Sequence, residues 1–239
     1  MPQIRVVNKS RNISDDLVAV MTEAVNIQFD HHFLPEWDSS DIEVVFDPKA
    51  KKRHKVSDVW TVALFDTSHQ WEFHHERPSA AVFCRGPLDH GSEPLTGPYA
   101  LSMLLSHECL ELAVDPYVTQ WSMTGMDQFG QSTCVAYDIA NPVDNQFYEV
   151  MVNGSPVNVS NFVLPAWFDQ QSVNMKTDVL DMLDKKALLL TSGGYTVTWG
   201  AGGQEQTYGE DLPHWRLKQK RCRGSRGFRR MMSRQFRMV

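Results

Sequence analysis

Residues 104–115 read LLSHECLELAVD, and this stretch carries the strongest indication of both structure and function. Its apolar residues recur at the spacing of an α-helix, which we expect to begin near Pro98 and to end at Val114. Residues four apart on a helix differ by about 40° around the axis, so His107 and Glu111 project side by side. The spacing therefore predicts that these two side chains share one metal ion.

Glu108 lies about 100° around the helix from His107, at the flank of this pair. A carboxylate placed there can act as a general base and take a proton from an attacking water molecule. This is the logic of the HExxH zinc peptidases, with Glu111 in place of the second histidine. Zinc accepts carboxylate oxygen as well as imidazole nitrogen, so zinc is the expected ion. The alternative is an amphipathic helix with an exposed acidic stripe.

A third protein ligand is required, and residues 137–144, YDIANPVD, offer three candidates. Asp138 is our first choice, followed by Asn141 and Asp144. The alternative for all three is a polar turn that satisfies its own backbone. Asp115 is a poor candidate, because eight residues along a helix place it about 12 Å from His107, and we expect it to have a structural role at the helix end.

The remaining histidines and the cysteines favour structural roles. His74 and His75 are adjacent and would point to opposite faces in a strand, so at most one of them could bind a metal, and polar surface residues are the simpler interpretation. The four cysteines form no CxxC pair and are too few to indicate a disulfide framework, which predicts a reducing compartment. Cys109 is expected to be a small buried thiol.

The pattern predicts a βαββ-type start of the chain, and short strands dominate the second half. Ser14 is expected to cap a helix that reaches Gln28 or Phe29. The Asn153-Gly154 pair predicts a hairpin turn. A second helix is expected from about Thr177 to Leu190. The expected strands are residues 3–7, 42–46, 59–65, 80–84, 133–139, 147–152, 157–159 and 195–199.

Charge is distributed unevenly along the chain. Ten of the 23 Lys and Arg residues lie within residues 216–239 and no acidic residue does, so this tail carries +10 and the chain before it −16. Such a tail is typical of a segment that binds something negative. We expect a domain over residues 1–213 and a basic tail over residues 214–239. The tail's expected partner is a neighbouring acidic subunit, or alternatively nucleic acid.

No run of about 18 apolar residues suggests a membrane span, and the first ten residues, MPQIRVVNKS, lack the features of a secretory signal. The expected location is therefore the cytoplasm of a host cell or a virion.

The residues quoted above also resemble a family of uncharacterised proteins from bacteria and tailed phages, which carry SHExxE followed by a DP pair. The resemblance covers most of the chain. Its segments are VVNKS at 6–10, LPEW at 34–37, SHECLELAVDP at 106–116, YDIANPVD at 137–144, VSNFVLPAWF at 159–168 and SGGY at 192–195. The family usually reads YE-x-C-D-x-x-E where this chain has Asp138, Asn141 and Asp144.

The resemblance implies an α+β, zincin-like single domain with a mixed sheet, a metal-site helix and the basic tail. It implies metal at His107 and Glu111 and catalytic assistance from Glu108. Our first hypothesis is a zinc-dependent peptidase with Asp138 as the third ligand, and the resemblance to phage proteins suggests a component of a phage particle. The second is a catalytically silent virion protein whose tail docks on a neighbouring subunit or on nucleic acid.

Overall fold

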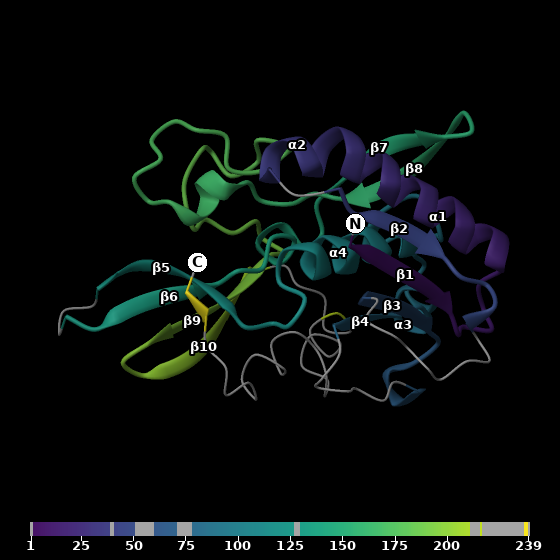
Figure 1. Ribbon diagram of the computed structural model, residues 1–239, viewed down its shortest axis with the longest axis horizontal. Helices are drawn as coiled ribbons and strands as arrows, with labels where there is room; N and C mark the ends of the chain where they lie inside the picture. The colour runs from purple at the N-terminus through teal and green to yellow at the C-terminus, as the bar shows by residue number, and fades with distance from the viewer. Residues whose placement is uncertain are drawn as a thin grey trace. The chain divides into compact units, whose positions relative to one another are not determined.

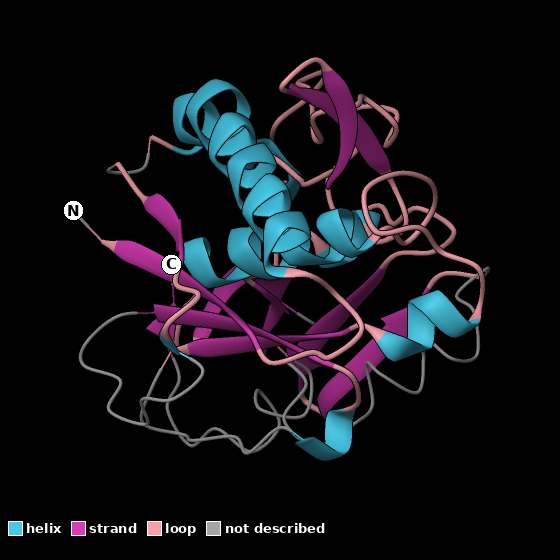
Figure 2. Ribbon diagram, turned by 90° about the vertical axis from the view of Figure 1, so that its right-hand side faces the viewer, coloured by secondary structure: helices cyan, strands magenta, loops and turns pink. Residues whose placement is uncertain are grey.

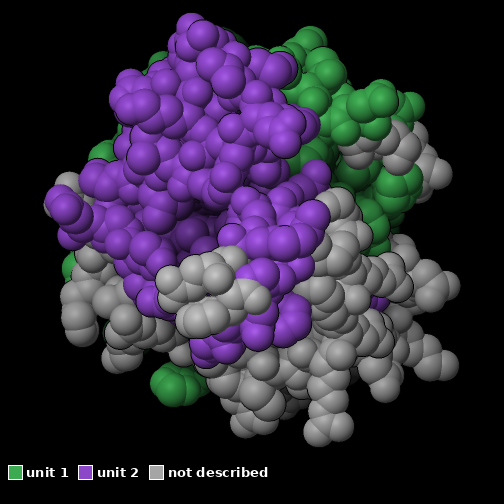
Figure 3. Space-filling model, turned by 90° about the vertical axis from the view of Figure 1, so that its left-hand side faces the viewer, with its two compact units in different colours: residues 1–116, 147–160 green, residues 117–146, 161–239 purple. Residues whose placement is uncertain are grey.

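The computed structural model describes residues 2–38, 41–50, 60–70, 78–126, 130–210, 216 and 237–238. The chain divides into two compact units (Figures 1 and 3): unit 1 is residues 1–116 and 147–160, and unit 2 is residues 117–146 and 161–239. The expected domain over residues 1–213, followed by a basic tail, stays a prediction. His74, His75 and most of the basic segment 49–55 lie outside the described residues.

Unit 1 is built on a parallel sheet with strand order β2-β1-β3-β4. Its strands are β1 (Gln3–Asn8), β2 (Glu43–Phe46), β3 (Trp60–Phe65) and β4 (Ser79–Phe83). Val6 of β1 is in register with Phe46 on one side and Val62 on the other. These strands match the expected apolar runs and confirm the βαββ start of the chain.

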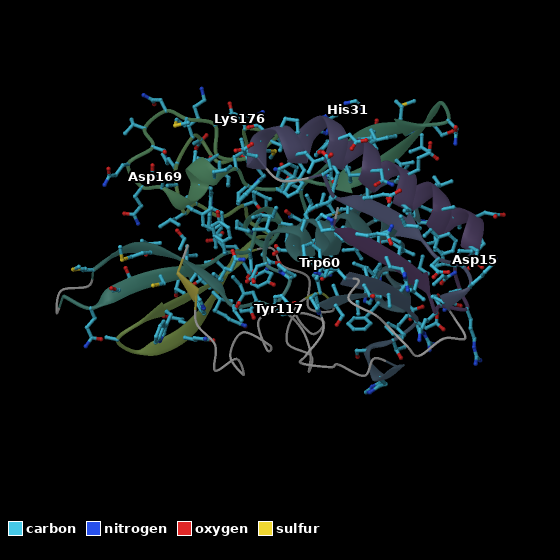
Figure 4. The ribbon with its side chains drawn as sticks, viewed as in Figure 1. Asp15, His31, Trp60, Tyr117, Asp169 and Lys176 are labelled. Atoms are coloured by element: carbon cyan, nitrogen blue, oxygen red, sulfur yellow. The ribbon has the colours of Figure 1, made fainter. Side chains whose placement is uncertain are left out.

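Helix α1 (Asp15–Gln28) connects β1 to β2 and begins where the sequence predicts. The Ser14 side chain accepts a hydrogen bond from the backbone N–H of Leu17 at 3.2 Å, which satisfies one of the free donors of the first turn. Asp15 and Asp16 place negative charge at the positive end of the helix dipole. Asp15 lies at this end of the helix in Figure 4.

The chain continues from α1 into a π-helical turn, η1 (Phe29–Phe33), and a short helix, α2 (Leu34–Trp37). The backbone N–H of Leu34 donates to the carbonyl of Phe29, five residues earlier, which is the hydrogen bond that defines a π-turn. The sequence analysis did not predict this turn. Such turns rotate the residues that follow relative to an unbroken α-helix.

Helices α1 and α4 (Leu101–Val114) cover the same face of the parallel sheet. Helix α1 contacts β1 and β2, α4 contacts β3 and β4, and the two helices contact each other. The hairpin of β7 (Phe147–Val152) and β8 (Ser155–Ser160) packs on the opposite side of the helices, so that they lie between sheet and hairpin (Figures 1 and 2). Helix α4 is therefore enclosed from two sides. It begins at Leu101 rather than near Pro98, and Asp115 ends it as expected.

The hairpin turn at Asn153-Gly154 is confirmed. Asn153 has φ of 51° and Gly154 has φ of 80°, and two consecutive positive φ values are the signature of a type I′ turn. This turn fixes the pairing of Val150 with Val157, whose side chains join Ala24 of α1 in the core of unit 1.

Unit 2 contains a five-stranded sheet with order β10-β9-β6-β5-β11. Its strands are β5 (Gln120–Met126), β6 (Ser132–Ala136), β9 (Tyr195–Gly200), β10 (Gly203–Tyr208) and β11 (Arg237–Met238). Trp121, Cys134, Ala136, Tyr195 and Val197 form the core on one face. Strand β5 was not predicted because a register shift near Gly125 interrupts the alternation of its apolar and polar residues. Strand β10 was not predicted because its sequence, GQEQTY, is largely polar.

The helix expected from Thr177 to Leu190 is wrong, because the structure has turns and irregular backbone there. The buried carboxylate of Asp178 accepts hydrogen bonds from the backbone N–H groups of Leu180, Met182 and Leu183. An Asp that binds nearby backbone donors competes with the helical pattern. Residues with positive φ between 181 and 188 confirm that the backbone leaves the helical region.

The shorter helical segments are α3 (Arg85–Asp89), η3 (Ser68–Gln70), η4 (Asn141–Val143) and η5 (Pro165–Phe168). The molecule is a mixed α and β protein, as expected. Its described strands form three separate sheets rather than one mixed sheet. Within the described part of the chain, the helices are too short or too polar to cross a membrane.

Candidate metal site

Helix α4 carries His107, Glu108 and Glu111, and it is buried around most of its circumference. His107 is 1% exposed and Glu111 is 0% exposed, whereas Glu108 is half-buried. The alternative of an exposed acidic stripe therefore does not hold for Glu111. The helix places one imidazole and one carboxylate, four residues apart, inside the protein.

A buried carboxylate requires compensation, because its transfer out of water without a partner costs several kcal/mol. Among the described residues, no hydrogen bond reaches Nδ1 of His107 or Oε2 of Glu111, although each of these residues takes part in a further interaction. Imidazole nitrogen and carboxylate oxygen are both zinc ligands. The two side chains therefore offer atoms of the types that zinc binds, as two of the three or four protein ligands that a zinc site needs.

The serines of α4 fasten the helix to the hairpin. The Ser102 hydroxyl donates to two backbone carbonyl groups, that of Leu95 at 3.1 Å and that of Asn158 at 2.7 Å. One turn later, the Ser106 hydroxyl accepts a hydrogen bond from the backbone N–H of Ser160 at 3.0 Å. Both serines are fully buried. Two turns of the helix are thus held by polar contacts to β8 and to the loop before α4.

Gln28, the last residue of α1, is the centre of a buried polar network next to this serine face. Its Nε2 donates to the carbonyl of Ser160 at 2.7 Å and to the hydroxyl of Tyr148 at 3.0 Å. Its Oε1 accepts from the Ser106 hydroxyl at 2.5 Å. The Tyr148 hydroxyl lies 2.9 Å from Nδ1 of His32 in the π-helical turn. The network links α1, η1, α4 and both strands of the hairpin.

The arrangement of donors fixes the direction of each hydrogen bond. A carbonyl oxygen cannot donate, so the Gln28 atom facing Ser160 must be the amide nitrogen. Burial raises the pKa of Tyr148, so this residue keeps its proton at neutral pH. Since Tyr148 already accepts from Gln28, we assign its proton to the bond with Nδ1 of His32, which makes that nitrogen an acceptor. The neighbouring His31 is exposed and points outward (Figure 4).

The three candidates for the third ligand belong to unit 2. Asp138 follows β6 and is 2% exposed, and Asn141 begins η4 and is fully buried. Asp138 Oδ2 accepts no hydrogen bond within the described residues, although the residue takes part in a further interaction. Asp138 remains a prediction for the third ligand.

Asp144 has a different partner. Its two carboxylate oxygens accept hydrogen bonds from Arg216, at 3.1 Å from Nε and 2.9 Å from NH2. The side chains are 0% and 7% exposed, so this is a buried, bidentate ion pair. Arg216 is the first basic residue of the tail, and near the other end of the tail β11 runs parallel to β5. The carboxylate of Asp144 is thus paired with Arg216.

Over the described ranges, three or more His, Cys, Asp or Glu side chains do not gather into a metal-binding group. His107 and Glu111 are both buried and lie one helical turn apart, and the metal site with all of its ligands stays a prediction. Asp115 is buried at the C-terminal cap of α4, where the sequence analysis placed it.

The described cysteines are buried, as expected for Cys109. Cys84, Cys109 and Cys134 are buried and form no disulfide. Burial raises the pKa of Cys84 to about 12 and also raises the pKa of Cys109. Both thiols are therefore protonated at neutral pH, and the thiolate form that binds metals is disfavoured.

Sequence reasoning did not identify Gln28, His32, Ser106 and Tyr148 as parts of one network. One indication was present, because Gln28 continues the apolar face of α1 and a glutamine in that position must find partners. Comparison with known proteins identifies no matching family, curated relative or solved structure.

Proposed function

We propose that the protein is a zincin-like metallopeptidase whose metal site is built on α4, with His107 and Glu111 as ligands of a zinc ion. The observation that carries this proposal is the burial of these two side chains one turn apart, on a helix whose buried residues are mostly apolar. Asp138 is the proposed third ligand. The proposal also places the protein in a phage particle, and this part depends on the sequence resemblance alone.

Each residue has a distinct role in peptide hydrolysis. A bound zinc ion would supply a Lewis acid that polarises the scissile carbonyl. Glu108 is the general base, and it is half-buried whereas His107 and Glu111 are buried. Glu108 is the proposed catalytic residue, and His107 and Glu111 hold the metal.

Metal analysis tests the site directly. We expect the full chain, purified with zinc and dialysed, to retain one zinc ion, and His107→Ala to lose most of it because a nitrogen ligand is removed. Elemental mass spectrometry measures the content. His90→Ala, which removes an exposed histidine of the same unit, is the matched control and should retain the ion. Full zinc content in His107→Ala would show that the metal binds elsewhere. Loss of zinc from Asp138→Asn would support Asp138 as the third ligand.

A second candidate function is a catalytically silent virion protein. The described contacts on either side of the basic segment 217–236 favour it: Arg216 pairs with Asp144, and residues 237–238 pair with β5. The sequence of that segment contains eight Lys and Arg residues and no acidic residue. Such a composition suits binding to a neighbouring acidic subunit, with nucleic acid as the alternative partner.

Substitutions within this segment distinguish binding to a protein subunit from binding to nucleic acid. Replacing its eight basic residues by Gln, with Arg216 kept to preserve the pair with Asp144, should abolish either interaction. Phe228→Ser should weaken docking on a protein but leave binding to duplex DNA intact, because phosphate contacts do not need the ring. Fluorescence anisotropy with duplex DNA at about 50 and 200 mM salt, beside sedimentation analysis of assembly, measures both. If the Gln variant behaves as wild type in both assays, the segment binds neither partner.

A further inference from the structure

We infer that Gln28 is a positioning residue for the metal-binding helix, acting through Ser106 on His107; this rests on the proposed function. Ser106 precedes His107 on α4, so the two side chains leave the helix about 100° apart. A contact that fixes the direction of Ser106 therefore fixes the rotation of His107 and Glu111 about the helix axis.

Gln28 is suited to this task because its carboxamide has little freedom. Both protons of Nε2 are used, on the Ser160 carbonyl and on Tyr148, and Oε1 accepts from Ser106. Ser106 in turn accepts from the N–H of Ser160. Gln28, Ser106 and Ser160 thus close a ring of three hydrogen bonds between α1, α4 and β8. A rotation of α4 would break at least one of them inside the protein, where unsatisfied groups are costly.

The π-helical turn extends this ring to His32. The turn η1 follows Gln28 immediately, and its extra residue changes the direction of the next side chains by about 100° relative to an unbroken α-helix. In this geometry Nδ1 of His32 meets the Tyr148 hydroxyl at 2.9 Å, and the two rings are 5.1 Å apart edge-to-face. Tyr148 thereby stays oriented toward Gln28.

The structure offers a matched control on the same face of α4. Ser102 is as buried as Ser106, but its hydroxyl bonds to the backbone carbonyl groups of Leu95 and Asn158 instead of the Gln28 side chain. Ser102→Ala removes a comparable hydrogen bond one turn earlier. A purely structural network predicts similar consequences for both positions, whereas the positioning role predicts a difference in metal binding.

The experiment measures the dissociation constant of zinc for the full chain by competition with a chromophoric chelator. Gln28→Met keeps the approximate length of the side chain and removes every hydrogen bond, and we expect it to bind zinc about tenfold more weakly than wild type. Tyr148→Phe removes only the hydroxyl and should give a smaller loss in the same direction. Ser102→Ala should bind zinc as wild type does, although its melting temperature falls.

The outcomes distinguish this inference from the proposed function. If wild-type protein binds no zinc, or if His107→Ala binds it equally well, the proposed function fails and the inference with it. If wild type binds zinc through His107 and a folded Gln28→Met binds it as tightly, only the positioning role is overturned. If Gln28→Met does not fold, the zinc affinity of Tyr148→Phe is the test. An affinity equal to that of Ser102→Ala would overturn the positioning role of Gln28, and a weaker affinity would support it.

Discussion

Glu108→Gln is expected to retain zinc and to lose peptide hydrolysis by a factor of about 10² to 10⁴, the usual contribution of a general base. The amide has nearly the shape of the carboxylate but cannot accept a proton from water. His107 and Glu111 are unchanged by the substitution, so metal content should stay at the wild-type level. The measurement is cleavage of a fluorescent casein by zinc-loaded protein, with metal content determined on the same samples.

Glu149→Gln is the matched control, because it makes the same chemical change at an exposed position on β7 of the same unit. It should cleave casein as wild type does. Equal cleavage by Glu108→Gln and wild type would refute the role of Glu108. If none of the three proteins cleaves while zinc is bound, the silent virion protein becomes the better account.

Asp144→Asn is expected to destabilise unit 2 by about 3 to 5 kcal/mol, because it leaves the charge of Arg216 buried without its partner. The pair is 0% and 7% exposed, so solvent neither screens the interaction nor compensates for its loss. Urea denaturation followed by tryptophan fluorescence measures the effect, since Trp121 and Trp167 are fully buried in unit 2.

The control is the ion pair of Arg85 with Asp89, whose side chains are 63% and 60% exposed. Asp89→Asn should cost less than about 1 kcal/mol, as exposed pairs do. The double variant Asp144→Leu with Arg216→Met should recover much of the lost stability, because two apolar side chains replace two buried charges. A wild-type denaturation midpoint for Asp144→Asn would mean that the ion pair does not stabilise unit 2.

The sequence determined the local structure wherever a short-range physical rule applies. The Ser14 cap, the Asn153-Gly154 turn and the strands of the parallel sheet follow from side-chain hydrogen bonding, backbone sterics and apolar alternation within a few residues. The same holds for half of the candidate site. The four-residue spacing of His107 and Glu111 fixes their common direction on any helix.

Only the tertiary structure decided how these elements are enclosed and which polar groups meet. Glu111 is buried rather than part of an exposed stripe because the sheet, α1 and the hairpin cover α4 from different sides. Gln28 meets Ser106 across 78 positions of sequence, and Asp144 meets Arg216 across 72. Periodicity and propensity act over one or two helical turns, so they carry no information about such partners. The irregular backbone after Asp178 also depends on a partner outside this range of sequence. The Asn161 side chain donates a hydrogen bond to the buried carboxylate of Asp178 and so holds this carboxylate in the core of unit 2.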